Sequence, residues 1–169
     1  GTEVFFPEPD YFKADGNEAR NYQSNLASEG ARGGAIYVGE HTALILAGEL
    51  SNNKTRAKYF DNPATYGENV ESYSRGGAVY VANTDGRLQL RGGPARENLN
   101  PTYLTNNTSG AGGAIYFDGN ASHYEPLVIG GSDETLITRD YGFDIKLENN
   151  TSLTFGGAIV SKRPLSING

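Results

Sequence analysis

Apolar residues alternate with small or polar residues in short segments of this chain, and one such segment occurs four times. It reads Gly-Gly-Ala followed by an apolar residue, and the copies begin at Gly33, Gly76, Gly112 and Gly156, spaced 43, 36 and 44 residues apart. The apolar positions after the glycines have a period of two, and no stretch has the spacing of a helical face. Each copy therefore predicts a short β-strand.

Two other segments recur in a fixed order with the first. Before it stands an apolar residue, then any residue, then asparagine, an imperfect match only in the first copy; the asparagines are Asn25, Asn62, Asn106 and Asn149. After it stands Leu-x-(Leu/Ile)-x-Gly, at residues 44–48, 88–92, 127–131 and 165–169. A unit repeated at this period is typical of a solenoid, in which each repeat stacks on the next.

Three strands in each repeat predict a coil with three faces. Stacked coils pair each strand in parallel with its counterpart, about 4.8 Å away. The sequence thus predicts an all-β fold, a parallel β-helix (β-solenoid) with loop insertions, and the usual handedness of parallel connections makes it right-handed. We expect about four coils, at residues 22–58, 59–102, 103–145 and 146–169. Residues 1–21 do not fit the repeat and are predicted to be an N-terminal cap, or else a flexible leader.

The alternation also sorts the side chains of the glycine segment. Ile36 and Val38 lie on one side, with Val79, Val81, Ile115, Phe117 and Ile159, and this purer apolar set is predicted to face inward. The other side carries a row of tyrosines, Tyr37, Tyr80 and Tyr116. That row either packs on itself or forms a ligand face that receives sugar rings.

The repeated glycines and asparagines are predicted to be structural. A coil must turn before the glycine segment, and glycine adopts φ > 0 without steric cost. The four repeated asparagines, placed inside at one corner, can bond to one another from coil to coil, as stacked amides do. The structural glycines are Gly33, Gly34, Gly76, Gly77, Gly112, Gly113, Gly156 and Gly157.

Composition narrows the classes of partner. The 169 residues carry a net charge of −6, which disfavours binding to nucleic acid. The chain has no cysteine, so it forms no disulfide and no thiolate metal site. No apolar window approaches the length of a membrane span, and we expect no membrane insertion by this chain.

No constellation of catalytic residues stands out, and we predict no catalytic residue, no metal site and no cofactor. An outward row of Ser24, Asp61, Thr105 and Glu148 holds two carboxylates two coils apart, roughly 9.6 Å, at the outer limit for an inverting glycosidase pair. His41 and His123 lie in coils that are not neighbours and lack further zinc ligands. Calcium is the one metal left open, at Asp133, Glu134, Asp140 and Asp144, although no ordered calcium-loop signature is present.

Asn-x-Ser/Thr sequences mark candidate glycosylation sites in a secretory eukaryotic host. They occur at six asparagines, two of which, Asn106 and Asn149, we expect inside. The candidates are Asn53, Asn107, Asn120 and Asn150. The alternative is that the recurring Asn-Asn-Thr belongs to the corner of the coil.

The combination of Gly-Gly-Ala-(Ile/Val) with an apolar-plus-asparagine segment resembles the repeat of the chlamydial polymorphic membrane proteins, marked by GGA(I/L/V) and FxxN. All four glycine segments match. FxxN matches with leucine for phenylalanine at residues 104–107 and 147–150, whereas Phe60 is followed by Pro63. The resemblance covers residues 22–169 and implies a surface-exposed autotransporter passenger that acts in adhesion or surface structure.

We therefore expect a non-enzymatic, extracellular or cell-surface module, a rigid rod that displays loops. Its expected partners are a host or cell-surface protein, a glycan, or other copies of itself. The last of these follows from the uncovered last coil, which would either continue into a longer solenoid or stack end to end into a filament. The alternative function is a carbohydrate-binding or polysaccharide-cleaving β-helix.

Overall fold

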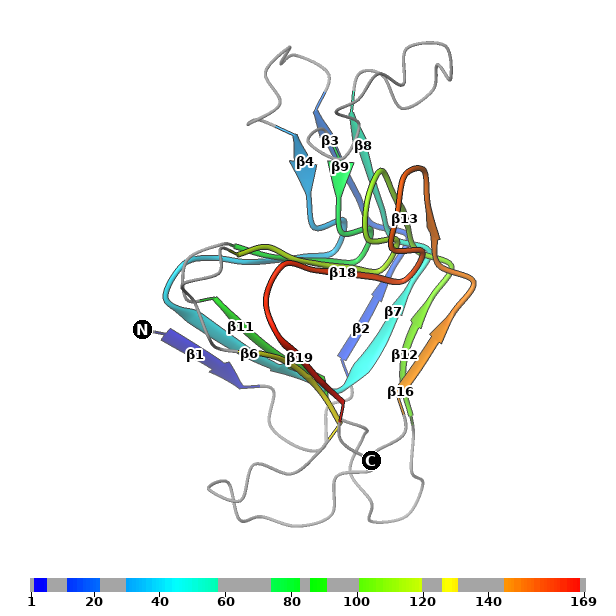
Figure 1. The fold of residues 1–169 in the computed structure, drawn as a ribbon. Helices are drawn as coiled ribbons and strands as arrows, with labels where there is room; N and C mark the ends of the chain where they lie inside the picture. The colour runs from blue at the N-terminus through cyan, green and yellow to red at the C-terminus, as the bar shows by residue number, and fades with distance from the viewer. Residues whose placement is uncertain are drawn as a thin grey trace.

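The computed structural model describes residues 2–5, 12–21, 30–57, 74–82, 86–90, 101–119, 126–130 and 145–167, and these residues form β-strands and turns, with no helix. All described strand pairs are parallel and join one turn of the chain to the next. Viewed along the stack, the chain encloses a triangle with an arm at one corner (Figure 1). The predicted parallel β-helix is confirmed.

Three sheets form the sides of the triangle, each named here after one strand. The β6 sheet has the order β1 (Thr2–Phe5), β6 (Thr42–Leu46), β11 (Arg87–Leu90), β15 (Leu127–Ile129) and β19 (Leu165–Ile167). The β7 sheet has the order β2 (Phe12–Asp15), β7 (Gly48–Ser51), β12 (Thr102–Thr105) and β16 (Ile145–Glu148). The β10 sheet has the order β5 (Ile36–Val38), β10 (Val79–Val81), β14 (Ile115–Phe117) and β18 (Ile159–Ser161).

The arm is formed by strands that the sequence patterns did not predict. The β8 sheet has the order β3 (Glu18–Asn21), β8 (Lys54–Ala57), β13 (Thr108–Ser109) and β17 (Thr151–Ser152), and β4 (Ala31–Arg32) pairs with β9 (Ser74–Arg75). In Figure 1 the strands β3, β8, β4 and β9 project from the triangle. Three strands per coil is therefore correct for the triangular body, but each turn carries at least one more short strand.

The inside of the triangle is filled mainly by the apolar side chains that the alternation predicted, together with Ala78 and Ala114, which the alternation places on the tyrosine side. Ile115 and Phe117 are fully buried, whereas Tyr116 between them belongs to a separate cluster on the outer face. Burying each such side chain contributes roughly 1.5–3 kcal/mol, which fixes the register of every strand. The buried core residues are Val38, Leu44, Leu46, Leu50, Ala78, Val79, Val81, Leu88, Leu90, Leu104, Ala114, Ile115, Phe117, Leu127 and Ile129.

The two glycines of each repeat serve different purposes. The first is in the left-handed region, with φ between +63° and +67° at Gly33, Gly76, Gly112 and Gly156, so the predicted turn is confirmed. The second lies beneath the backbone of the following turn. A Cβ on Gly113 would overlap the carbonyl oxygen of Gly157 and come within 2.7 Å of the Thr151 nitrogen.

The expected N-terminal cap is wrong for the residues that the structure describes. Strand β1 pairs with β6, β2 with β7 and β3 with β8, all in parallel register, so residues 2–5 and 12–21 are strands of the solenoid itself. The first turn is hard to see in the sequence because its apolar-x-x-Asn segment, Ala14–Asn17, carries alanine where later turns carry leucine. The boundaries proposed for the coils remain a prediction.

One buried arginine ties the last turn to the two before it. The Arg163 guanidinium lies over the Phe117 ring, 3.8 Å from its centroid. Its Nε donates to the Asp118 carbonyl at 2.9 Å, and one Nη donates to the Gly86 carbonyl at 2.6 Å. A side chain at Gly119 would collide with that of Arg163, which accounts for glycine there.

The repeat offers a matched pair of substitutions that tests the close approach of turns. Gly113→Ala places a methyl group against the backbone of the next turn, and such overpacking typically costs about 1–3 kcal/mol or more. Gly157→Ala meets no atom closer than 3.6 Å and should leave the free energy of unfolding nearly unchanged. Urea unfolding followed by circular dichroism measures both; equal effects would contradict the stacking of turns described here.

Candidate functional site

The tyrosine row on the outer face of the β10 sheet is the most distinctive surface feature predicted. Tyr37, Tyr80 and Tyr116 occupy one register position in β5, β10 and β14. Their rings stack with centroids 5.3 Å and 5.9 Å apart and interplanar angles of 24° and 17°. Val160 continues the row in β18.

Arginines of the β4–β9 pair cover this row. The Arg32 guanidinium lies 5.1 Å from the centroid of the Tyr80 ring, and that of Arg75 lies 5.0 Å from the centroid of the Tyr116 ring. Each arginine thus covers the tyrosine of the following turn, a cation–π arrangement. At the next turn the register partner of Arg75 is Ala111, so the pattern ends there.

A buried carboxylate completes the cluster. Asp118 Oδ2 accepts the Tyr80 hydroxyl at 2.7 Å and forms an ion pair with Arg75 at 3.1 Å. Burial, then the hydrogen bond to Asp118 and its negative charge, raise the pKa of Tyr80 above the ordinary value for tyrosine. The Tyr80 phenol therefore stays protonated and serves as a donor.

The cluster rules out the tyrosine row as a continuous ligand face. Tyr80 and Tyr116 are 2% and 0% exposed, so no sugar ring can lie on them. Tyr37, 52% exposed in the first turn, is the only accessible member. The row packs on itself, which was the alternative that the sequence left open.

A ladder of asparagines runs along the corner between the β7 and β8 sheets. Asn53 donates through its backbone N–H and its Nδ2 to the Oδ1 of Asn107, at 3.0 and 3.1 Å. Asn107 donates in the same way to Asn150, at 3.0 and 3.0 Å, and Asn17 to Asn53, at 3.0 and 3.0 Å. Each Nδ2 from Asn53 onward also donates to a carbonyl of the preceding turn, as Asn107 does to Leu50 at 2.9 Å.

The ladder residues differ from those predicted from the sequence. Asn106 and Asn149 are exposed at the corner, with φ of 57° and 55°, while their neighbours Asn107 and Asn150 point inward. A left-handed residue interrupts the alternation of the strand, so the inward position falls one residue later than a strict period of two places it. The other two predicted ladder positions, Asn25 and Asn62, lie outside the described residues.

The same shift overturns most of the glycosylation candidates. Asn53 and Asn107 are fully buried and Asn150 is partly buried. The side-chain amides of all three form hydrogen bonds in the ladder. A glycan on any of them would remove those hydrogen bonds. Asn120 lies outside the described residues.

The outward carboxylate row also has different members from those expected. Asp15, Ser51, Thr105 and Glu148 share one register in the β7 sheet, so Glu148 and Asp15 are three strands apart, about 14 Å. That separation exceeds the range of a glycosidase pair. Ser24 and Asp61 lie outside the described residues.

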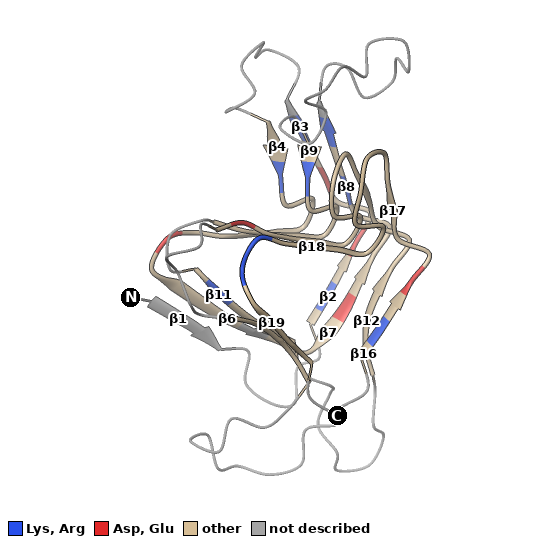
Figure 2. Cartoon of the chain, viewed as in Figure 1, with Lys and Arg blue, Asp and Glu red and all other residues tan. Residues whose placement is uncertain are grey.

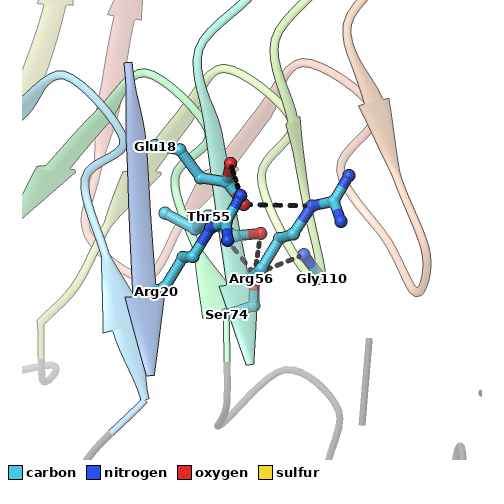
Figure 3. Close-up of polar contacts among 6 residues, drawn as sticks. All are labelled: Glu18, Arg20, Thr55, Arg56, Ser74 and Gly110. Atoms are coloured by element: carbon cyan, nitrogen blue, oxygen red, sulfur yellow. Dashed lines mark hydrogen bonds and ion pairs between the residues drawn. The ribbon is translucent and has the colours of Figure 1, made fainter. Parts of the chain in front are cut away.

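Basic residues gather on the arm. Arg20, Lys54 and Arg56 lie on β3 and β8, and Arg32 and Arg75 on β4 and β9 (Figure 2). Glu18 pairs with Arg20 at 2.7 Å and with Arg56 at 3.1 Å (Figure 3). Adjacent arginines in register repel one another, and the shared carboxylate offsets that repulsion.

Buried hydroxyls join the two layers of the arm beside this ion cluster. The Ser74 Oγ donates to the Thr55 carbonyl at 2.8 Å and therefore accepts from the Thr55 hydroxyl at 2.7 Å and the Gly110 N–H at 3.1 Å (Figure 3). Ser74 and Thr55 are 1% and 0% exposed. Sequence reasoning missed this network because two hydroxyl residues in different segments carry no recognisable spacing.

Metal-binding groups do not come together in the described part of the chain. Within it, no cluster of three or more His, Cys, Asp or Glu side chains could hold a metal ion. His41 is exposed after β5. The other histidine, His123, lies outside the described residues, as do Asp133, Glu134, Asp140 and Asp144. Over the same described ranges, no helix is long and apolar enough to cross a membrane.

Comparison with known proteins identifies the repeat. Residues 101–118 and 144–162 match the model of the Chlamydia polymorphic membrane protein repeat. The chain carries this repeat. The two matches span β12–β14 and the corresponding strands β16–β18, so they include the asparagine ladder and the glycine turn of two neighbouring turns. No curated protein and no solved structure matches the chain significantly.

The FxxN element of the repeat now has a structural meaning. Its asparagine is the ladder residue, and its first position is the core residue three before, as in Leu104 with Asn107 and Leu147 with Asn150. The same spacing at Leu50–Asn53 and Ala14–Asn17 was the signal that could have found the whole ladder. The spacing apolar-x-Asn selects the left-handed corner residues Asn106 and Asn149 instead.

We expect the ladder to be a main source of stability. Asn107→Ala removes the acceptor of two bonds from Asn53, and each buried polar group left without a partner costs about 1–3 kcal/mol. Asn106→Gly is the control, because residue 106 is exposed and glycine adopts its φ freely. Chemical denaturation measures both; an Asn106→Gly chain as unstable as Asn107→Ala would contradict the assignment.

The ion cluster on the arm predicts a pH dependence. The hydrogen bond from Arg20, aided by the charges of Arg20 and Arg56, holds the pKa of Glu18 below its ordinary value, although burial acts the other way. A lowered folded-state pKa contributes stability above the unfolded-state value, about 4.3, and this contribution is lost as the pH falls through the folded-state pKa. Glu18→Gln should therefore flatten the acid limb of the free energy of unfolding, whereas Thr151→Ala, a change at an exposed position of the same sheet row, should not.

Proposed function

We propose that this chain is a non-enzymatic module of an extracellular or cell-surface protein, a rigid rod of β-helix that presents its inserted segments for adhesion. The match to the polymorphic membrane protein repeat supports this, since that family is one of surface-displayed passengers of the autotransporter type. The expected partner is a host or cell-surface protein or a glycan.

The proposal rests on the observation that polar and aromatic side chains of the body contact one another within the scaffold. The asparagines bond to the next turn, the tyrosines stack on one another, and Asp118 is held by Tyr80 and Arg75. Such groups hold the scaffold together and leave recognition to the segments between strands, where binding residues of rigid scaffolds commonly lie. The segments at 58–73, 91–100 and 131–144 lie outside the described residues.

Adhesion of coated beads to cultured cells tests the proposal. Replacing residues 58–73 or 131–144 by a Gly-Ser segment of equal length should lower bead binding at least tenfold for the segment that carries recognition. Exchange of an exposed body residue, Lys13→Ala, is the matched control and should leave binding unchanged. Binding that survives every segment replacement would contradict display on loops.

The alternative, a carbohydrate-cleaving β-helix, is tested in parallel. Incubation with acidic polysaccharides followed by detection of new reducing or unsaturated ends should show no turnover. Turnover that Asp61→Asn abolishes would overturn the proposal.

We further propose that copies of the chain stack end to end. The motivation is the exposed apolar surface of the last turn, where Leu153, Phe155, Leu165 and Ile167 lie. Sedimentation velocity over a wide concentration range tests this, with larger species expected as the concentration rises.

A further inference from the structure

The arm concentrates positive charge on a chain that is acidic as a whole. The net charge of the chain is −6, yet Glu18 is the one acidic residue of the described arm strands. The same strands carry several basic residues (Figure 2), which are Arg20, Arg32, Lys54, Arg56 and Arg75. A local excess of positive charge attracts anions to that part of the surface even when the total charge is negative.

The alternation of side chains along β3 and β8 places three of these cations on one outward face. Thr55 is buried and hydrogen-bonded to Ser74 of the other layer, so its neighbours Lys54 and Arg56 point the opposite way. Arg20 is the register partner of Arg56 and shares this face. The side chains of Arg20 and Arg56 are 55% and 30% exposed, so solvent reaches both guanidinium groups.

Glu18 neutralises only part of the charge on this face. Its carboxylate pairs with Arg20 at 2.7 Å and with Arg56 at 3.1 Å (Figure 3), and its register partner is Lys54. One carboxylate stands against two guanidinium groups and one ammonium group, so positive charge remains in excess on two neighbouring strands. Because these cations repel one another, an anion from solution lowers their electrostatic energy as the Glu18 carboxylate does.

A row of hydroxyl groups continues from the cations along the rod. Lys54 is in register with Thr108 of β13, and Thr108 is in register with Thr151 of β17. Thr151 is exposed and Thr108 is half-buried. A ligand that lies along this row therefore meets charged groups in the first two turns and hydroxyl donors and acceptors in the next two.

The chemistry of this face selects the class of anion. Guanidinium groups bind sulfate and phosphate oxygens through paired N–H donors, and threonine hydroxyls suit the hydroxyls of a sugar. The strands β3, β8, β13 and β17 contain no aromatic residue on which nucleic-acid bases could stack. A nucleic-acid duplex is also repelled by the negative charge of the chain as a whole. These features favour a sulfated polysaccharide.

We propose that the arm binds a sulfated polysaccharide, whose sulfate groups contact Arg20, Lys54 and Arg56. Thr108 and Thr151 bind sugar hydroxyls further along the same chain. This site goes beyond the function proposed above, because it lies on strands of the scaffold and not on the segments between strands. The contact is largely ionic, so its affinity falls as the ionic strength rises.

Two double variants of equal net charge test the site, with heparin as the sulfated polysaccharide. Arg20→Gln with Lys54→Gln removes two cations from the arm, whereas Lys13→Gln with Lys146→Gln removes two exposed cations from the β7 sheet. In titration calorimetry the arm variant should bind heparin at least about tenfold more weakly, because charge-assisted hydrogen bonds are lost. The β7-sheet variant should bind heparin as tightly as the unchanged chain.

A third variant is expected to gain affinity, which a folding defect would not produce. Glu18→Gln removes the one carboxylate of this face, so heparin should bind about three- to fivefold more tightly. Thermal unfolding of all the variants identifies a chain that has lost its structure. If the arm double variant unfolds, the result for Glu18→Gln decides.

Two other polymers test the class of ligand. Hyaluronan carries carboxylates but no sulfate, and it should bind at least about tenfold more weakly than heparin. Duplex DNA that binds as tightly as heparin would overturn the assignment to a glycan, and so would equal binding of hyaluronan.

The remaining outcomes separate this site from adhesion through the inserted segments. The site is overturned if heparin fails to bind even at low ionic strength, if both double variants lose affinity equally, or if Glu18→Gln brings no gain. Those results leave the proposed function standing, because bead binding that depends on residues 58–73 or 131–144 is measured separately. Bead binding that fails while heparin binding responds as expected would overturn display on loops and support the site on the arm.

Discussion

Each side chain within the stack must fit the residues at the same register position in the neighbouring turns, often near copies of itself, and the structure depends on that constraint. The hydrogen bonds of a parallel β-helix run between turns, so a residue that fits one turn is tested again by the next. Glycine at positions 34, 77 and 113 satisfies the constraint by having no side chain where a carbonyl passes. Asparagine at 53 and 107 satisfies it with a side-chain amide whose Nδ2 donates to both neighbouring turns and whose Oδ1 accepts from the preceding one.

The same constraint explains why the polar and aromatic rows have structural duties. Identical rings in register attract one another, so Tyr80 and Tyr116 are buried in a stack and covered by Arg32 and Arg75. Identical charges in register repel one another, and Arg20 and Arg56 accordingly share the carboxylate of Glu18. A row of like residues on a β-helix is thus a poor guide to a binding site until its exposure is known.

The repeat allowed the fold to be predicted from the sequence, whereas the conformation of the corner of the coil could not be predicted. A period of two at Ile36 and Val38 predicts a strand with these side chains inside, and Gly33 predicts a turn with positive φ. Both predictions were correct. The ladder was misplaced by one residue because Asn106 adopts a left-handed conformation that no alternation reveals. The arm and the first turn were missed because their cues, such as Ala14 and Ser74, are single small residues whose meaning comes only from partners on other turns.

Arg163 has a mechanical consequence. The bonds between turns lie along the rod, so tension applied to its ends loads the rungs one after another, and the terminal turn would peel away first. The Arg163 side chain holds the last turn to carbonyl groups of the two preceding turns, at Asp118 and Gly86. Peeling that turn must therefore break its contacts with two other turns at once, so these turns resist force as a block and not as single rungs.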